Sequence, residues 1–410
     1  NLFYQMVKRL ESSGELSKET VFIDGTKLEA CANKYTFVWK KSVGKWEEKM
    51  FRKIQESVEL VNREYIQSFT VTEETRTADL QKICRFLETF CIDRQVVFVH
   101  GRGKRKSNHQ RYLELFRRFL ERQTTYDWHT ASFQGRNNYC KTDPDATFMH
   151  MKDDHMRNAQ LKPGYNVQIG VDSEYIVAVD IFQDRNDVWT LVPFLKTMEE
   201  KLGFRYPSVT ADSGYESEEG YTYLRETGQD PYIKPQTYEK WKKRSFKKDI
   251  SKRENMEYEE STDTYTCHAG KKLKPIFVKK QKSKSGYQSE VTVYECEDCS
   301  GCPYKERCTK AKGNKRLYVS KSFLEKRQES YENILSEKGI QYRMNRSIQV
   351  EGAFGVLKND YEFQRFLLRG KTKVKLEILL LCMGYNLNKL HAKIQNGRTG
   401  SHLFEIKKSA

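Results

Sequence analysis

Two short apolar segments, each followed directly by an aspartate, place the strongest constraint on how this chain can fold. Residues 20–23 precede Asp24, and Ser208–Ala211 precede Asp212. Short β-branched and aromatic runs that end at polar residues predict buried strands. The two segments lie far apart in the sequence, so they can become neighbours only if the residues between them fold largely outside the sheet. We therefore expect a sheet that carries a large insertion.

Strand and helix patterns alternate along the rest of the chain. Strand patterns at Tyr165–Val171 and Tyr175–Phe182 flank a predicted turn at Asp172–Ser173. A helical pattern follows Asn186–Asp187, and Tyr232–Lys234 is a further short strand pattern. This order predicts an α/β fold in which a mixed sheet is flanked by helices.

Charge and periodicity divide the chain into five predicted parts. Trp46, Met50 and Ile54 begin an apolar series at helical spacing within a highly charged segment, and the residues from 236 on are richer in Tyr, Val and Cys. The chain begins with Asn1 inside a helical pattern, so we expect most of an amino-terminal region to be missing. The five parts are 1–40 with the first Asp, a helical basic insertion at 41–140, core residues 141–235 with the second Asp, a β-rich basic insertion with cysteines at 236–316, and carboxyl-terminal helices at 317–410.

The chain is strongly basic, with 73 Lys and Arg against 56 Asp and Glu and a net charge of +17. This surplus suggests a polyanionic partner, with nucleic acid as the first candidate and a merely solvated basic surface as the alternative. Trp241 and Phe246 lie within one basic run, where they can stack on an unpaired base. The basic residues expected to contact phosphates are Arg102, Lys104, Arg105, Lys106, Lys240, Lys242, Lys243, Arg244, Lys247 and Lys248.

A third acidic residue, Glu351, extends the pair of aspartates to a set of three carboxylates. It borders an apolar stripe at helical spacing, so it can face a sheet from the edge of a buried surface. Three convergent carboxylates bind hard cations such as Mg²⁺ or Mn²⁺, and two such ions about 4 Å apart promote in-line displacement at a phosphate ester. Taken singly, an Asp-Gly pair is most often a turn and a helical Glu is most often solvated. The stripe consists of Val350, Phe354, Leu357 and Tyr361.

Several short stretches around these residues follow one another in a characteristic order. They are Phe22-Ile23-Asp24-Gly25-Thr26-Lys27, Ala32-Asn33-Lys34-Tyr35-Thr36-Phe37, Pro163-Gly164-Tyr165-Asn166-Val167-Gln168, Ala211-Asp212-Ser213-Gly214-Tyr215, Val350-Glu351-Gly352-Ala353-Phe354-Gly355 with Lys358, and Tyr385-Asn386-Leu387. Taken together, from about residue 20 to 390, they resemble the DDE transposases of bacterial insertion sequences, in the group numbered eleven-eighty-two.

The resemblance implies a fold, a chemistry and a partner. The fold is a ribonuclease H-like core in which Asp24, Asp212 and Glu351 form the metal-binding triad, with Lys358 as a further catalytic residue that contacts phosphate. The chemistry is Mg²⁺-dependent cleavage and strand transfer, with two metal ions. The partner is double-stranded DNA, at the element ends and at the target, and a homodimer is expected to act during transposition.

Related groups also surround the glutamate with a Tyr, an Arg and a Lys at the spacing Y-x2-R-x3-E-x6-K. Lys358 fits this spacing. Tyr342 and Arg346 are displaced from it, and Ser347 occupies the place where the Arg is expected.

Four of the ten cysteines are concentrated in one short segment. They are Cys296, Cys299, Cys302 and Cys308, and Cys267 lies some way upstream. Four thiolates at this spacing predict a structural Zn²⁺ that stabilises the β-rich insertion, with reduced and shielded thiols as the alternative. The clustering of thiols and the lack of a signal peptide favour a reducing interior.

Two functions are compatible with these patterns. The first is a transposase that cleaves and transfers DNA strands, and the alternative is a catalytically inactive, DNA-binding remnant of one. Neither a Gly-rich phosphate loop nor a G-x-S-x-G motif is present, which argues against NTPases and serine hydrolases. The longest apolar stretch, around Ile378–Met383, is much shorter than the ~20 residues that span a bilayer. We expect a bacterial cytoplasmic protein associated with the nucleoid.

Overall fold

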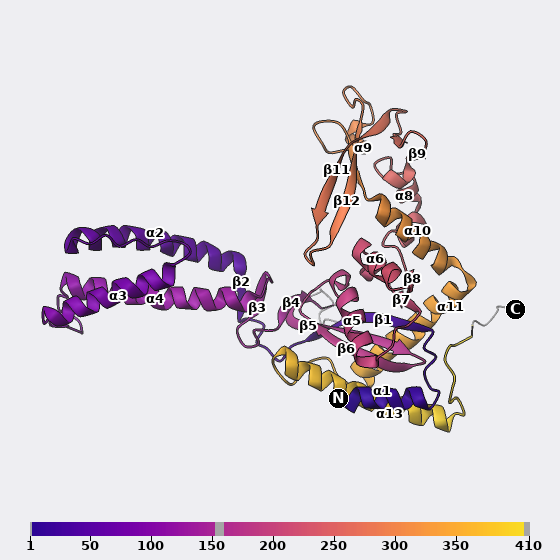
Figure 1. The fold of residues 1–410 in the computed structure, drawn as a ribbon, viewed down its shortest axis with the longest axis horizontal. Coiled ribbons are helices and arrows are strands. Elements are labelled where there is room, and N and C mark those ends of the chain that lie inside the picture. Colours follow the sequence, from indigo (N-terminus) through magenta and orange to yellow (C-terminus); the bar gives the residue numbers. More distant parts are fainter. Residues whose placement is uncertain (1, 152–159, 406–410) are drawn as a thin grey trace. The chain divides into compact units, whose positions relative to one another are not determined.

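The computed structural model describes residues 2–151 and 160–405, so Asn1 and parts of the predicted segments 141–235 and 317–410 lie outside the described residues. The chain forms two compact units (Figure 1). The core unit comprises Asn1–Leu28, Tyr165–Phe366 and Thr372–Ala410, and the helical unit comprises Glu29–Gly164 and Leu367–Lys371. Both units are discontinuous in sequence, and the division into five parts stays a prediction.

The core unit is built on a mixed sheet in which β6, β5, β1, β7 and β8 are neighbours in this order. A sixth strand, β4 (Thr147–His150), pairs with the first residues of β5, Leu161–Gly164. β5 and β6 are antiparallel, whereas β1, β7 and β8 run parallel to one another. The predicted mixed α/β architecture is therefore confirmed. The strands are β1 (Thr20–Glu29), β5 (Leu161–Asp172), β6 (Tyr175–Phe182), β7 (Ser208–Ala211) and β8 (Asp230–Ile233).

Two details of these strands differ from the sequence prediction. β1 continues beyond Ile23 to Glu29, although its pairing with β7 ends where Ile23 faces Ala211. The turn between β5 and β6 lies at Ser173 and Glu174, one position later than predicted, and both residues have positive φ angles of 55° and 73°. The turn conformation that joins twisted antiparallel strands requires such angles, and here residues other than glycine adopt them.

Helices cover both faces of this sheet. Successive strand residues point to opposite faces, and nearly all residues of β5 and β6 are buried, so both faces need a covering layer. On one face a Cβ at Gly170 would lie 3.1 Å from Val21 Cγ2 and 3.4 Å from Met198 Sδ of α5, so only glycine lets strand and helix approach this closely. On the other face the ring of Phe22 packs against Tyr342 of α11. The helices of this unit are α1 (Leu2–Ser12), α5 (Leu191–Leu202), α6 (Glu218–Glu226), α10 (Lys321–Leu335), α11 (Glu337–Arg346) and α13 (Lys371–Gln395).

The outer strand β6 is protected by α13. The side-chain amide of Asn386 accepts a hydrogen bond from the backbone N–H of Ile176 at 2.9 Å and donates one to its carbonyl at 2.8 Å. An open strand edge would leave these groups unpaired, so the amide takes the place of a further strand.

A second sheet within the core unit corresponds to the predicted β-rich insertion. Its strand order is β13-β12-β11-β10-β9, with every pair antiparallel, and β11 and β12 form a long hairpin (Figure 1). The hairpin tip contacts the core through Lys284, which pairs with Asp184 at 2.5 Å. The elements are α7 (Tyr238–Trp241), α8 (Arg244–Lys247), β9 (Glu257–Glu259), β10 (Thr264–Thr266), β11 (Lys272–Lys282), β12 (Gln288–Cys296), α9 (Lys305–Cys308) and β13 (Arg316–Val319).

The helical unit consists mainly of three helices that bury a common apolar core. Met50 and Ile54 lie in that core as predicted, but Trp46 is 58% exposed, so the predicted apolar stripe begins one turn later. The loop that contains the basic residues Arg102 to Lys106 ends at Ser107. The hydroxyl of Ser107 caps α4 by accepting a hydrogen bond from the backbone N–H of Gln110. The elements are β2 (Phe37–Trp39), α2 (Lys40–Tyr65), α3 (Arg76–Asp93), α4 (Asn108–Phe133), β3 (Asn138–Cys140) and β4 (Thr147–His150).

Candidate functional site

The two aspartates singled out from the sequence lie side by side in the structure. Ile23 on β1 is paired with Ala211 on the parallel strand β7, so Asp24 and Asp212 follow at equivalent positions on neighbouring strands. Backbone N–H groups orient both carboxylates, with Gly25 donating to Asp24 Oδ1 at 2.8 Å and Gly214 donating to Asp212 Oδ1 at 2.7 Å. The sheet thus places two half-buried carboxylates at one point.

A further carboxylate, that of Asp187, lies between the backbone segments that follow these two aspartates. A Cβ at Gly25 would lie 3.0 Å from Asp187 Oδ1, and a Cβ at Gly214 would lie 3.5 Å from Asp187 Oδ2. Asp187 begins a short 3₁₀ segment, Asp187–Trp189, directly after the loop that follows β6. The sequence prediction used Asp187 only as a helix cap and missed its place beside Asp24 and Asp212.

Two buried amides on β5 hold Asp187 in this position. Asn166 donates to Asp187 Oδ1 at 2.8 Å, and Gln168 donates to the same oxygen at 3.0 Å. Gln168 in turn accepts a hydrogen bond from the hydroxyl of Tyr215. Buried polar side chains at alternate positions of a strand require partners. In the sequence, Asn166 and Gln168 at alternate positions of a strand indicate that buried polar partners are needed. The structure identifies Asp187 as that partner.

The charge of this group of carboxylates acts on Tyr215, which is fully buried beside it. Burial raises the pKa of Tyr215 well above its usual value, and the negative charges of Asp187, Asp24 and Asp212 raise it further. The phenol therefore stays protonated and keeps donating to Gln168. Its hydrogen bond ties the segment after Asp212 to β5.

Glu351 is linked to one of the two strand aspartates, Asp24, through an arginine. Arg346 contacts Asp24 Oδ2 at 3.3 Å with one guanidinium nitrogen and Glu351 Oε1 at 2.9 Å with the other. Ser347 also donates to Glu351 Oε2, at 3.1 Å. Only one guanidinium group therefore separates Glu351 from Asp24. The Glu351 side chain is 54% exposed, which leaves it accessible to a ligand.

The displacement of Arg346 by one residue is explained by the local helix geometry. Ser347–Glu351 is a π-helical segment, in which hydrogen bonds join residues five apart instead of four. Arg346 precedes Glu351 by five residues, so the wider turn places it where an arginine four residues earlier would lie in an α-helix. Tyr342, by contrast, is buried between the rings of Phe22 and Tyr232 and lies in the core.

The segment around Glu351 is not the continuous α-helix that the apolar stripe predicted. After the π-helical segment it continues as α12 (Gly352–Gly355) and a second π-helical segment, Val356–Asp360. Gln349 anchors it by accepting from the backbone N–H of Glu174 at 2.8 Å, in the β5–β6 turn. Lys358 is partly buried in the second π-helical segment. Of the stripe, Val350, Phe354 and Leu357 are buried, and Tyr361 is only partly buried.

The chemistry of this donor set fits a hard divalent cation. Mg²⁺ and Mn²⁺ prefer oxygen ligands such as carboxylates. The carboxylates near the ends of β1 and β7 and on the Glu351 segment are those of Asp24, Asp187, Asp212 and Glu351. In the described part of the chain no three His, Cys, Asp or Glu side chains already stand close enough together to hold a metal ion. Arg346 instead neutralises two of the carboxylates.

The remaining predicted site residues lie elsewhere. The five cysteines Cys267, Cys296, Cys299, Cys302 and Cys308 line one pocket of the β-rich sheet, which adds Cys267 to the predicted set.

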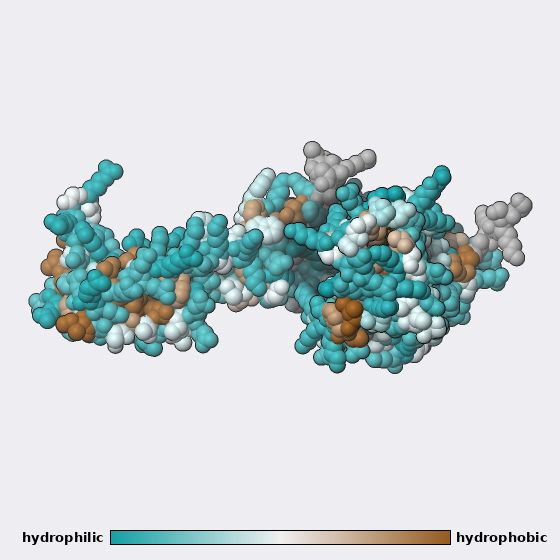
Figure 2. Space-filling view, turned by 90° about the horizontal axis from the view of Figure 1, so that it is seen from above, coloured by the Kyte–Doolittle hydropathy of each residue, from teal (hydrophilic) through white to brown (hydrophobic). Residues whose placement is uncertain are grey.

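The basic residues fall into two sets that belong to different units. Arg102, Lys104 and Arg105 are exposed in the helical unit, and Lys106 there pairs with Glu114 at 2.6 Å. In the core unit the exposed set consists of Lys240, Lys242, Lys243, Arg244, Lys247 and Lys248. The face in Figure 2 is largely hydrophilic, with smaller hydrophobic patches. No helix in the described residues is both long enough and apolar enough to span a membrane.

The aromatic ring of Trp241 in the basic run already has partners within the protein. Trp241 packs edge-on against Tyr331 of α10, with ring centroids 5.4 Å apart, and the guanidinium of Arg327 lies over its ring. Stacking of Trp241 and Phe246 on a base stays a prediction.

Comparison with known families gives a match for the carboxyl-terminal part of the chain. A family model described as a transposase DDE domain matches residues 266–391, a segment that includes Glu351 and Lys358 but neither Asp24 nor Asp212. No curated protein and no solved structure matches the chain. The segment from residue 266 to 391 is therefore similar to the DDE domain of transposases.

Proposed function

We propose that this chain is the catalytic part of a DDE transposase, which cleaves and transfers DNA strands at the ends of an insertion sequence. The observation that carries the proposal is the convergence of Asp24, Asp212 and Glu351. Asp24 and Asp212 follow neighbouring strands, and Arg346 contacts both Asp24 and Glu351. The match to a transposase DDE domain, which covers Glu351, supports the proposal as well.

The strand order supports a ribonuclease H-like core. β5 lies on one side of β1 and pairs with β6 in antiparallel orientation, while β7 and β8 add parallel strands on the other side of β1. This order makes β1 the central strand. Reactive groups gather where neighbouring parallel strands end, and Asp24 and Asp212 lie at that point.

The reaction consists of two displacements at phosphorus. Water first attacks a phosphodiester at the element end, and the bond from phosphorus to the 3′ oxygen breaks, which frees a 3′-hydroxyl. That hydroxyl then attacks a phosphodiester of the target, forms a new bond to phosphorus and releases the target's own 3′ oxygen. A pair of Mg²⁺ or Mn²⁺ ions held by the triad supplies activation of the attacking oxygen and neutralisation of the leaving one.

The side chains around the triad have supporting roles. Asp187, fixed by Asn166 and Gln168, adds negative charge beside Asp24 and Asp212 and helps to retain the cations. Arg346 and Lys358 contact non-bridging phosphate oxygens, because guanidinium and ammonium groups bind phosphate strongly. The basic residues of the two units bind the DNA backbone without reading its sequence, and a bacterial cytoplasmic homodimer at the nucleoid is the form in which we expect the protein to act.

Nicking of a supercoiled plasmid in the presence of Mg²⁺ tests the proposal. Asp24→Ala, Asp212→Ala and Glu351→Gln should each lower the nicking rate by a factor on the order of 10² or more, because each removes a metal ligand. Asp360→Asn, which changes an exposed carboxylate of the same segment, is the matched control and should nick normally. Binding of plasmid DNA should change by less than about twofold in all four variants, since phosphate contacts elsewhere dominate affinity.

Two results would count against the proposal. Normal nicking by Glu351→Gln would remove Glu351 from the site. A wild-type chain that binds the plasmid but does not nick it with Mg²⁺ or Mn²⁺ would favour the inactive, DNA-binding remnant.

A further inference from the structure

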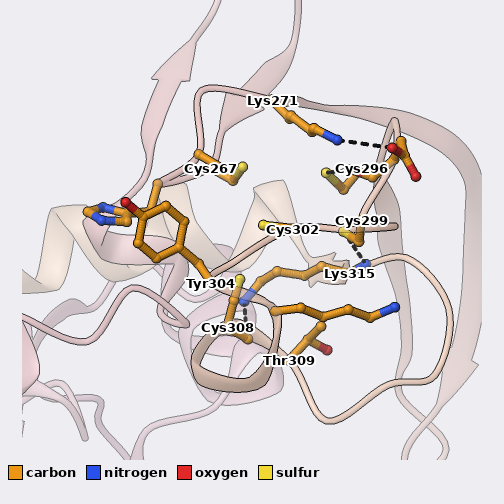
Figure 3. A pocket seen from close by; sticks show the side chains of 13 residues that line it. Cys267, Lys271, Cys296, Cys299, Cys302, Tyr304, Cys308, Thr309 and Lys315 are labelled. Atoms are coloured by element: carbon orange, nitrogen blue, oxygen red, sulfur yellow. Dashed lines mark hydrogen bonds and ion pairs between the residues drawn. The ribbon is translucent and has the colours of Figure 1, made fainter.

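The pocket beside α9 gathers half of the chain's ten cysteines from four separate segments. Cys267 lies in the turn between β10 and β11, Cys296 ends β12, Cys299 and Cys302 lie in the following loop, and Cys308 ends α9. Figure 3 shows their sulfur atoms directed toward the same space. All five are free thiols, so the segments that carry them are not joined by disulfides.

The sheet that carries this pocket has little else to stabilise it. Its buried core is small, and two of its members are Cys296 and Cys299 themselves. The loop from residue 297 to 315 contains only the four-residue helix α9. Small folds with so few buried apolar side chains usually depend on a disulfide or a metal.

The hydrogen bonds of two cysteines distinguish a ligand from a bystander. Cys299 Sγ accepts a hydrogen bond from the backbone N–H of Lys315 at 3.4 Å, which suits a thiolate. Cys296 instead donates its thiol hydrogen to the carbonyl of Asp298 at 3.8 Å. Cys296 is also the most deeply buried of the five, with 3% of its surface exposed in the apolar core of the sheet, so it is the cysteine least suited to bind a metal.

Positive charge surrounds the pocket. The ammonium group of Lys315 is buried beneath it and donates to the carbonyls of Ser251 at 2.7 Å and Cys308 at 2.9 Å. Lys271 lies at the rim, where it pairs with Asp298 (Figure 3). A divalent ion with four thiolates has an excess of negative charge, and the buried ammonium group of Lys315 offsets part of it.

We propose that this pocket binds one structural Zn²⁺ through Cys267, Cys299, Cys302 and Cys308, with Cys296 remaining a thiol. As the described side chains lie, no three of these cysteines stand close enough to hold an ion, so binding would require the thiols to approach one another. Bound there, the ion would join the β10–β11 turn to the loop and to α9. Cys267 thereby replaces Cys296 in the set that spacing alone had predicted. The site has no open position, so its role is to hold the sheet and not to react.

Metal analysis of the full chain, purified under reducing conditions without chelator, tests the proposal. The wild-type protein should contain about one equivalent of zinc. Cys267→Ser should lose nearly all of it, whereas Cys296→Ser, the matched control, should retain it. Absence of zinc from the wild-type protein would overturn the proposal, and so would full retention by Cys267→Ser or complete loss from Cys296→Ser.

A Co²⁺ titration keeps the test decisive if a variant folds poorly. Wild-type protein stripped of zinc and refilled with Co²⁺ should show the intense visible absorption of a tetrahedral, all-thiolate site, and Cys296→Ser should show the same spectrum. Spectra typical of an octahedral ion in oxygen ligands would reject the site. Neither measurement involves DNA, so its outcome is independent of the proposed transposase function.

Discussion

Arg346 lies between two of the carboxylates that the sequence brings to attention, and its contacts depend on the shape of its side chain. The planar guanidinium presents separate nitrogen atoms to Asp24 and to Glu351, at 3.3 and 2.9 Å. A lysine ammonium is a single point charge and cannot reach both groups in the same geometry. The group is also largely shielded, with 16% of the side chain exposed.

Two replacements of Arg346 distinguish the effect of its positive charge from that of its planar shape, because glutamine removes both and lysine keeps only the charge. We expect Arg346→Gln to lower Mg²⁺-dependent nicking by a factor on the order of 10–100, and Arg346→Lys to restore only part of that loss. Nicking rates at saturating DNA measure the effect. Arg343→Gln, which changes an arginine of the same helix that lies over the ring of Tyr238, serves as the control. Full activity of Arg346→Gln would show that the ion pairs are only structural.

At the scale of elements, a buried ion pair joins α13 to the segment that follows α1. Lys393 of α13 contacts Glu15, in the segment after α1, at 2.9 Å, with the two side chains 1% and 4% exposed. Tyr175 at the start of β6 donates to the same carboxylate at 2.8 Å. Burial alone would raise the pKa of Glu15, but the hydrogen bonds from Lys393 and Tyr175 outweigh it and lower that pKa.

Removal of one partner should be costly. Lys393→Met leaves a buried carboxylate without its cation, and we expect a loss of about 3–5 kcal/mol in the free energy of unfolding, measured by urea denaturation. Glu15→Gln with Lys393→Met should recover part of that loss. Lys389→Met, whose ammonium contacts Glu174 at 3.3 Å and is more exposed, should cost less.

The same pair predicts a pH dependence. The pKa of Glu15 is lower in the folded chain than in the unfolded one, so its stabilising contribution is complete above the unfolded value of about 4.3 and is lost as the pH falls through the folded value. Lys393→Met should flatten this part of the stability profile, below about pH 4.3. An unchanged acid limb would contradict the argument.

For the whole molecule, net charge predicts an affinity for DNA. A charge of +17 and exposed basic residues in both units predict affinity for any duplex through its phosphates. Such binding releases counterions, so it weakens as salt concentration rises.

We expect affinity for a labelled generic duplex, followed by fluorescence anisotropy, to fall by a factor on the order of 10³ between low and moderate salt. Lys243→Gln and Lys247→Gln should each reduce the slope against salt by about one unit if the residue contacts a phosphate. Lys82→Gln, an exposed lysine already paired with Asp79, should leave the slope unchanged. A flat titration of the wild-type chain would remove the electrostatic argument.

The sequence by itself determined the strands at Ser208–Ala211 and Tyr175–Phe182, the helical character of the charged insertion, and the three acidic residues worth testing. These features depend on local periodicity and on polar residues at the ends of apolar runs, and both can be read without knowing what packs against them.

Only the tertiary structure decided which groups meet. Asp187 reaches the aspartates because Asn166 and Gln168 hold it, and Arg346 meets Glu351 because a π-helical segment adds one residue to the turn. Cys267 lies near the other cysteines because it follows β10, which pairs with β11, and β11 in turn pairs with β12, the strand that ends at Cys296. Contacts of this kind depend on long-range packing and on small changes in helix register, which local sequence patterns do not encode.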